Sequence, residues 1–209
     1  DRPFRRNVDL AENIRGAWLD GKVDEAATSD LLKTLRTGSS EDACQQVVEL
    51  LSRGVGPQSI WDALHLGAGE LLARQPGIAS LHAVTTTNAL RYAYETSGRD
   101  RTRQMLMLQN AAFLPMFLEE MGGRGNVKAI DVEELAAEDG ESTPEVDEIF
   151  ARLGDDRAAG ARLALQRVSK TGEAEDVIDA ARVLTFLKGN DAHDYKFSSA
   201  ALEDYYLVS

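Results

Sequence analysis

Three histidines, His65, His82 and His193, are the side chains of this sequence best suited to carry chemistry. His65 and His82 lie among Trp, Leu, Ala and Thr in the least charged stretch of the chain. A neutral imidazole in such surroundings can bind a metal ion or transfer a proton near neutral pH. Three imidazoles would suit iron, copper or zinc and leave positions open for oxygen, water or substrate. The sequence therefore predicts a buried polar site with His65, His82 and His193 as metal ligands and with iron or a haem as cofactor.

The residues around His65 form an apolar stripe at helical spacing: Trp61, His65, Ala68 and Leu72. Asp62 stands three residues before His65, so both side chains can share one face of a helix. Trp61 is expected to wall the site beside His65.

Uncharged polar residues follow His82 in the run from Thr85 to Asn88. Threonine and asparagine are poor helix formers, and an exposed face of this protein would use Glu, Lys or Arg instead. The run fits a ligand-lined interior, with His82 as a catalytic group and Thr86, Asn88 and Tyr92 as substrate contacts. The alternative is that the threonines bond back to their own helix and pack as core.

Two later residues have equally open roles. Gln109 interrupts an apolar run that also contains Pro115, a residue that frees a backbone carbonyl inside a helix. Gln109 can therefore orient a substrate or satisfy that carbonyl. Lys196, close after His193, is a second candidate catalytic group, because its ammonium could stabilise a developing oxyanion. The alternative for His193 is a helix start capped by Asp191, with the imidazole partly exposed.

The elements that must position these residues are predicted to be helices. Ala, Leu, Glu and Arg recur at helical spacing, glycines punctuate the pattern, and alternating strand-like runs are missing. About ten helices are expected, at 8–19, 22–36, 41–53, 57–74, 80–97, 100–121, 144–153, 156–169, 173–188 and 192–206.

The expected architecture is all-α: a compact multi-helix domain spanning 1–209, with an acidic linker around 123–143. An α-solenoid is the alternative, although a repeat signature at a fixed period is missing. The three least charged helices, 57–74, 80–97 and 100–121, should be central. Their apolar stripes predict a core made of Trp61, Leu64, Leu81, Leu90, Leu106, Leu114 and Phe117.

Helix positions also limit how the histidines can meet. A short turn at 75–79 makes 57–74 and 80–97 antiparallel neighbours, so His65 and His82 are expected to face one pocket. Their depths along the helices differ by about 10 Å at 1.5 Å rise per residue. Direct ligation of one ion by both would therefore need a kink or a tilted crossing.

Composition narrows the function classes. The chain has 209 residues, 43% of them hydrophobic and 28% charged, which is typical of a soluble globular protein. A net charge of -12 argues against a nucleic-acid partner, and no apolar run reaches membrane-spanning length. The single cysteine, Cys44, excludes disulfides within the chain and thiolate metal clusters. A small-molecule substrate is the expected partner, and a homo-oligomer is compatible with the sequence.

Short motifs resemble the questin oxidase-like family. They are His82-Ala83-Val84-Thr85 with Asn88-Ala89-Leu90, preceded by Leu64-His65-Leu66-Gly67, and the late block His193-Asp194-Tyr195-Lys196 with Ala200-Ala201. The resemblance covers at most 57–117 and 190–206. It implies a largely helical protein with an oxygenase-like site lined by the three histidines.

Two function classes follow from these observations. One is an oxidoreductase or oxygenase acting on a hydrophobic organic substrate in a histidine-lined pocket. The other is a non-catalytic helical module that binds a haem, a small ligand or a partner helix.

Overall fold

Local signals in the sequence set most helix boundaries. The Asp24 side chain accepts a hydrogen bond from the Ala27 backbone N–H and starts one helix. Ser39 and Asp42 form a capping box that starts the next, and Pro57 occupies the first turn of a third. Gly172, with a φ of 74°, ends a later helix in the left-handed conformation that glycine adopts most easily.

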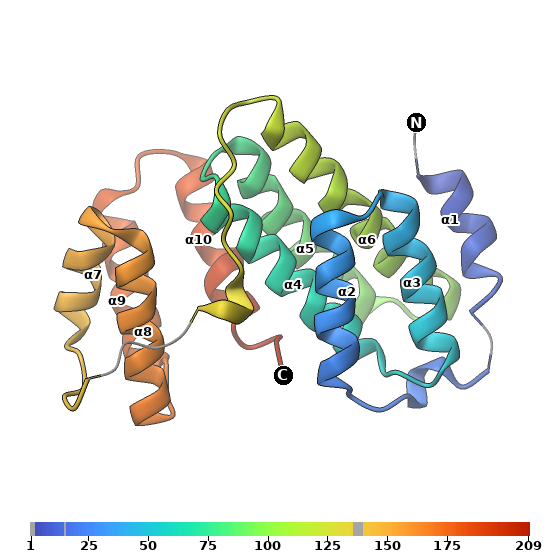
Figure 1. Ribbon diagram of the computed structural model, residues 1–209, viewed down its shortest axis with the longest axis horizontal. Coiled ribbons are helices and arrows are strands. Elements are labelled where there is room, and N and C mark those ends of the chain that lie inside the picture. The colour runs from blue at the N-terminus through green and yellow to red at the C-terminus, as the bar shows by residue number, and fades with distance from the viewer. Residues whose placement is uncertain (1–2, 15, 136–139) are drawn as a thin grey trace. The chain divides into compact units, whose positions relative to one another are not determined.

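The computed structural model describes residues 3–14, 16–135 and 140–209, and it is 75% helical. Within those ranges the chain forms ten α-helices and two short 3-10 helices (Figure 1). They are α1 (Phe4–Ala11), η1 (Trp18–Asp20), α2 (Glu25–Thr37), α3 (Ser40–Ser52), α4 (Pro57–Arg74), α5 (Ile78–Thr96), α6 (Asp100–Gly122), η2 (Val132–Glu134), α7 (Val146–Asp155), α8 (Arg157–Thr171), α9 (Glu175–Lys188) and α10 (Ala192–Asp204). The predicted all-α fold is confirmed.

One predicted helix, 8–19, is wrong. The chain instead forms α1 and the short η1, with Gly16 between them at a φ of 75°. That left-handed conformation breaks the helix that the apolar pattern predicts across this position.

The chain divides into two compact units, Asp1–Ile130 with Ala200–Ser209 (unit 1) and Asp131–Ser199 (unit 2). The sequence predicted one domain, and the first boundary between the units falls inside the predicted acidic linker at 123–143. That stretch is rich in charge and offers few apolar side chains to bury across it. Its residues 136–139 lie outside the described ranges.

Unit 1 is organised around α6, which packs against α1, α2, α3, α4 and α5. Figure 1 shows α2 alongside α4 and α3 alongside α6, although other helices separate them in sequence. In a solenoid each repeat contacts only its neighbours, so this packing favours the multi-helix bundle for unit 1.

The predicted core is only partly right. Trp61, Leu64 and Leu114 are buried as expected. Leu81, Leu90, Leu106 and Phe117 are half-buried. The reason on α5 is that its buried face consists of small side chains, Ala79, Ala83 and Thr87 among them. These let α5 approach its neighbours closely and leave the leucines at the flanks.

Unit 2 contains α7, α8 and α9, with Ile149 fully buried. The N-terminal turn of α8 lies against α7 at Gly160, where a Cβ atom would come within 2.6 Å of the Leu153 side chain. Across the described residues, no helix is long and apolar enough to span a bilayer.

Candidate functional site around His65

The three histidines occupy different environments. His65 on α4 is 5% exposed, whereas His82 on α5 and His193 in unit 2 are exposed. The expectation that His82 lines a buried pocket with His65 is wrong, because α5 turns its small residues inward and His82 outward. Among the described side chains, no group of three or more His, Cys, Asp or Glu residues is arranged to hold a metal ion.

The surroundings of His193 match the alternative expected for it. Asp191 accepts hydrogen bonds from the backbone N–H groups of His193 and Asp194, at 2.7 and 3.3 Å. Asp191 therefore caps the start of α10. Lys196, the predicted oxyanion group, is exposed in the same unit.

The predicted substrate contacts also separate. Trp61 is fully buried, Thr86 and Asn88 are half-buried, and Tyr92 is 69% exposed. Tyr92 cannot wall a buried pocket in this conformation.

The other polar side chains of α5 and α6 make structural hydrogen bonds. Thr85 bonds back to the Leu81 carbonyl, and Thr87 donates to the Asn110 side-chain oxygen across the α5–α6 interface. Gln109 accepts a 2.7 Å hydrogen bond from the buried Asn7 side chain and so ties α1 to α6. Gln109 thus has a role that neither prediction for it included.

A polar cluster forms around His65 instead, from α4, α5 and residues 200–209. The His65 Nδ1 atom lies 3.4 Å from the Asp204 Oδ1 atom, and the Asp204 side chain is only 14% exposed. Asn88 on α5 donates to that same Asp204 oxygen at 2.9 Å and to Glu203 at 3.2 Å. Neither ring nitrogen of His65 makes a hydrogen bond within the described chain.

Trp61, one helical turn before His65, also has a ring nitrogen without a hydrogen-bond partner. Its indole Nε1–H is buried without a hydrogen-bond partner in the described chain. The Trp61 ring centroid lies 6.0 Å from that of His65 and 5.3 Å from that of Tyr94. The Arg91 guanidinium carbon lies over the Trp61 ring, 5.4 Å from its centroid, a cation–π contact on one face of the indole.

Asp62, three residues before His65, accepts hydrogen bonds from residues 200–209. Its carboxylate accepts hydrogen bonds from the Ser209 backbone N–H at 3.1 Å and the Ser209 hydroxyl at 2.6 Å. Gln58 donates to both Asp62 and the Leu207 carbonyl, at 2.7 and 2.8 Å. This end of the sequence therefore lies over the face of α4 that carries His65.

Burial and nearby charge have opposite effects on the pKa of Tyr94, an aromatic residue of this cluster. Burial raises the pKa of the Tyr94 phenol, while the positive charges of Arg91 and Arg103 oppose that rise. The phenol is therefore neutral at physiological pH and serves as an aromatic wall for Trp61.

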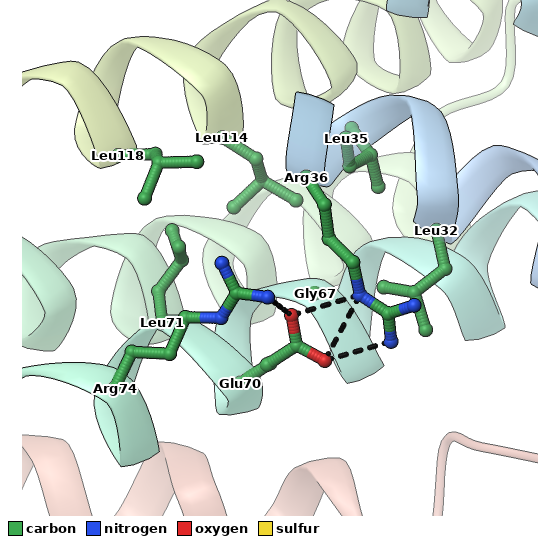
Figure 2. Close-up of a pocket in the computed structure, with 9 residues that line it drawn as sticks. All are labelled: Leu32, Leu35, Arg36, Gly67, Glu70, Leu71, Arg74, Leu114 and Leu118. Carbon is green, nitrogen blue, oxygen red and sulfur yellow. Dashed lines mark hydrogen bonds and ion pairs between the residues drawn. The ribbon is translucent and has the colours of Figure 1, made fainter. Parts of the chain in front are cut away.

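A second polar cluster, away from His65, closes a small cavity of about 10 Å³ (Figure 2). Figure 2 shows leucines from α2, α4 and α6 turned toward it, with the Glu70 carboxylate between Arg36 and Arg74. Glu70 accepts from Arg36 at 2.7 to 3.1 Å and from Arg74 at 2.8 Å. The cavity has room for about one water molecule, so this cluster holds helices together and does not house an organic ligand.

Comparisons with known proteins supply no family for this chain: family models, curated proteins and solved structures were each searched, and none matches.

Proposed function

We propose that unit 1 binds a small hydrophobic molecule bearing a hydroxyl group, and that His65 is the residue that contacts this hydroxyl. The observation that carries the proposal is the pairing of two buried, unsatisfied groups, the His65 imidazole and the Trp61 indole N–H. A buried polar group without a partner costs about 1–3 kcal/mol, and proteins rarely leave one unpaired unless a water or ligand completes it.

The chemistry of the two groups selects the ligand. If the proton of His65 sits on Nδ1, facing Asp204, the Nε2 atom is a hydrogen-bond acceptor. The Trp61 indole is a donor only. A hydroxyl group donates to the first and accepts from the second, and the two rings that carry these groups lie close together, with centroids 6.0 Å apart.

Water has the same hydrogen-bonding capacity as a hydroxyl, so the test must separate the two. The probe is phenol, with benzene as the matched compound that lacks the hydroxyl, titrated into the full chain with calorimetry and ligand-observed NMR. We expect saturable binding of phenol that exceeds that of benzene, is lost in His65→Ala and is retained in His82→Ala. Equal binding of both compounds, or binding indifferent to His65→Ala, would mean that the site holds only water.

A second candidate, general-base action of His65 on such a molecule, is supported by the Asp204 carboxylate 3.4 Å from the His65 Nδ1 atom. The oxidation step of the predicted oxidoreductase or oxygenase stays a prediction. A carboxylate in this position stabilises an imidazolium. The Nε2 atom would take the hydroxyl proton, leaving an oxyanion on the ligand and a positive charge on His65. Only this proton transfer is assigned to the chain. The roles predicted for His82 and Lys196, and the resemblance to the questin oxidase-like family, remain predictions.

Non-haem iron fits this cluster poorly, because His65 and Asp204 supply two ligands where such a site usually has three from the protein. A haem would need only the His65 imidazole as axial ligand. Metal analysis and absorbance spectra of the purified full chain test that point. Stoichiometric iron or haem that disappears in His65→Ala, but not in His82→Ala, would restore the metal hypothesis.

A further inference from the structure

The buried position of His65 means that a ligand needs a path to it. Residues 200–209, which we call the strap, lie against this cluster. Its Asp204 faces the His65 imidazole, and its Leu207 and Ser209 contact Gln58 and Asp62 one to two turns earlier on α4.

Side-chain hydrogen bonds attach the strap to unit 1. Asn88 donates to Glu203 and Asp204, Gln58 donates to the Leu207 carbonyl, and Ser209 donates to Asp62. Residues 200–204 of the strap form the last part of α10, and 205–209 follow it. Water can replace each of these hydrogen bonds when the strap moves away, so its release costs less than breaking a packed apolar interface.

Apolar burial contributes less to this attachment than it does for α4. Ala200 is buried and Leu202, Leu207 and Val208 are half-buried, but Tyr205 and Tyr206 are 45% and 52% exposed. The two tyrosine rings meet edge to face, with centroids 5.2 Å apart. By contrast, α4 is fixed through fully buried side chains such as Trp61 and Leu64.

We propose that the strap is a lid, which opens to admit the ligand to His65 and completes the site when it closes. This inference rests on the proposed function. The strap carries Asp204, the carboxylate that faces the His65 Nδ1 atom, so closure both shields the ligand from water and orients the imidazole. Asp204 is thus a positioning residue, and Asn88 is the latch that holds it in place.

Chemical modification of histidine by diethyl pyrocarbonate, mapped by mass spectrometry, tests the lid without any ligand. His82 and His193 are exposed and serve as internal references for the buried His65. Asn88→Asp should open the strap, because a carboxylate there repels Glu203 and Asp204. We expect a several-fold faster modification of His65, with His82 and His193 unchanged.

Controls separate opening from unfolding. Thr96→Ala removes a hydrogen bond to the Tyr92 carbonyl on the same helix, away from the strap, and should leave all three rates unchanged. Asn88→Ala gives a milder opening if the charged variant folds poorly, which circular dichroism would reveal. An unchanged His65 rate in a folded Asn88→Asp variant whose residues 203–209 exchange faster would overturn the lid.

A reversible closure gives the opposite test. In the double variant Asp62→Cys with Ser209→Cys, oxidation should tie the strap to α4, slow the modification of His65 and block phenol binding, and reduction should restore both. Unchanged modification in the oxidised form would contradict the lid. A lid detected by modification in a protein that ignores phenol would instead contradict the proposed function alone.

Discussion

His65 combines near-complete burial with two ring nitrogens that make no hydrogen bond in the described chain, and this combination sets it apart from His82 and His193. The apolar residues around His65 in the sequence indicated its burial correctly. The same reasoning failed for His82, because Ala79 and Ala83 take the inward positions on α5. Whether a helical residue is buried depends on which face of the helix packs against the core. A histidine among apolar residues does not reveal which face that is.

Glu70 is the single residue whose loss should be most damaging among the ion pairs described. Its side chain is 2% exposed and binds two arginines, Arg36 on α2 and Arg74 on α4. Glu70→Ala leaves Arg36 and Arg74 partly buried without this partner, so we expect a loss of about 3 kcal/mol in the free energy of unfolding. Glu120→Ala removes an exposed pair with Arg124 and should cost under about 1 kcal/mol in urea denaturation. Equal effects would show that burial of Glu70 contributes nothing.

Cys44 should behave as an inert side chain. Burial raises the pKa of its thiol to about 11, and the Sγ–H donates to the Leu108 carbonyl. The thiolate is the reactive form, so a thiol reagent at pH 8 should react with the unfolded chain much faster than with the folded one. Because the folded state holds this proton more tightly, Cys44 stabilises the fold below the thiol's unfolded pKa, and this contribution is lost as pH rises toward 11. Rapid reaction of the native protein would contradict the burial of Cys44.

At the scale of elements, most helices could be predicted from sequence because their boundaries depend on local signals. Ser39 forms its capping box directly at the start of α3, and Pro57 is in the first turn of α4. Each signal is therefore local to the helix that it begins. The His65 cluster could not be predicted in the same way. Asp204 meets His65 through a contact between segments far apart in the sequence, and its local sequence, Glu203-Asp204-Tyr205, carries no sign of that partner.

The two glycines inside α4 allow a matched test of that helix. A Cβ atom on Gly69 would meet open space, and one on Gly67 would meet three leucine methyl carbons at 3.4 to 3.5 Å, an ordinary contact distance. Alanine favours a helix over glycine by about 1 kcal/mol. Thermal or urea unfolding should therefore show Gly69→Ala and Gly67→Ala each more stable than the native chain. A strongly destabilising Gly67→Ala would mean that the cavity in Figure 2 is closed more tightly than described.

At the scale of the whole molecule, the chain has two compact units, and unit 2 is inserted in the sequence between the two parts of unit 1. Composition predicted a single domain because one chain of this length can form one core. The predicted linker at 123–143 contains the first boundary between the units, but the return of residues 200–209 to unit 1 depends on long-range contacts with α4 and α5.

The division predicts that damage to one unit stays local. In Gly160→Ala, the new Cβ atom would lie 2.8 Å from the Leu153 backbone nitrogen, so α7 and α8 must separate, at a cost of about 1–3 kcal/mol. Hydrogen exchange should accelerate in α7 and α8 and stay unchanged in α4 and α5. Gly154→Ala, where a Cβ meets open space, is the control and should leave both units protected. Acceleration across α4 as well would show that the units unfold together.

The hydroxyl-binding site at His65 is tested most directly by ¹⁵N NMR of the His65 imidazole in the full chain, recorded with and without phenol. We predict that Nδ1, facing Asp204, carries the proton, that Nε2 is unprotonated, and that phenol changes the Nε2 signal of His65 but not those of His82 and His193. A proton on Nε2 with Nδ1 bare, or a His65 signal that phenol leaves unchanged, would contradict a hydroxyl-binding site at His65.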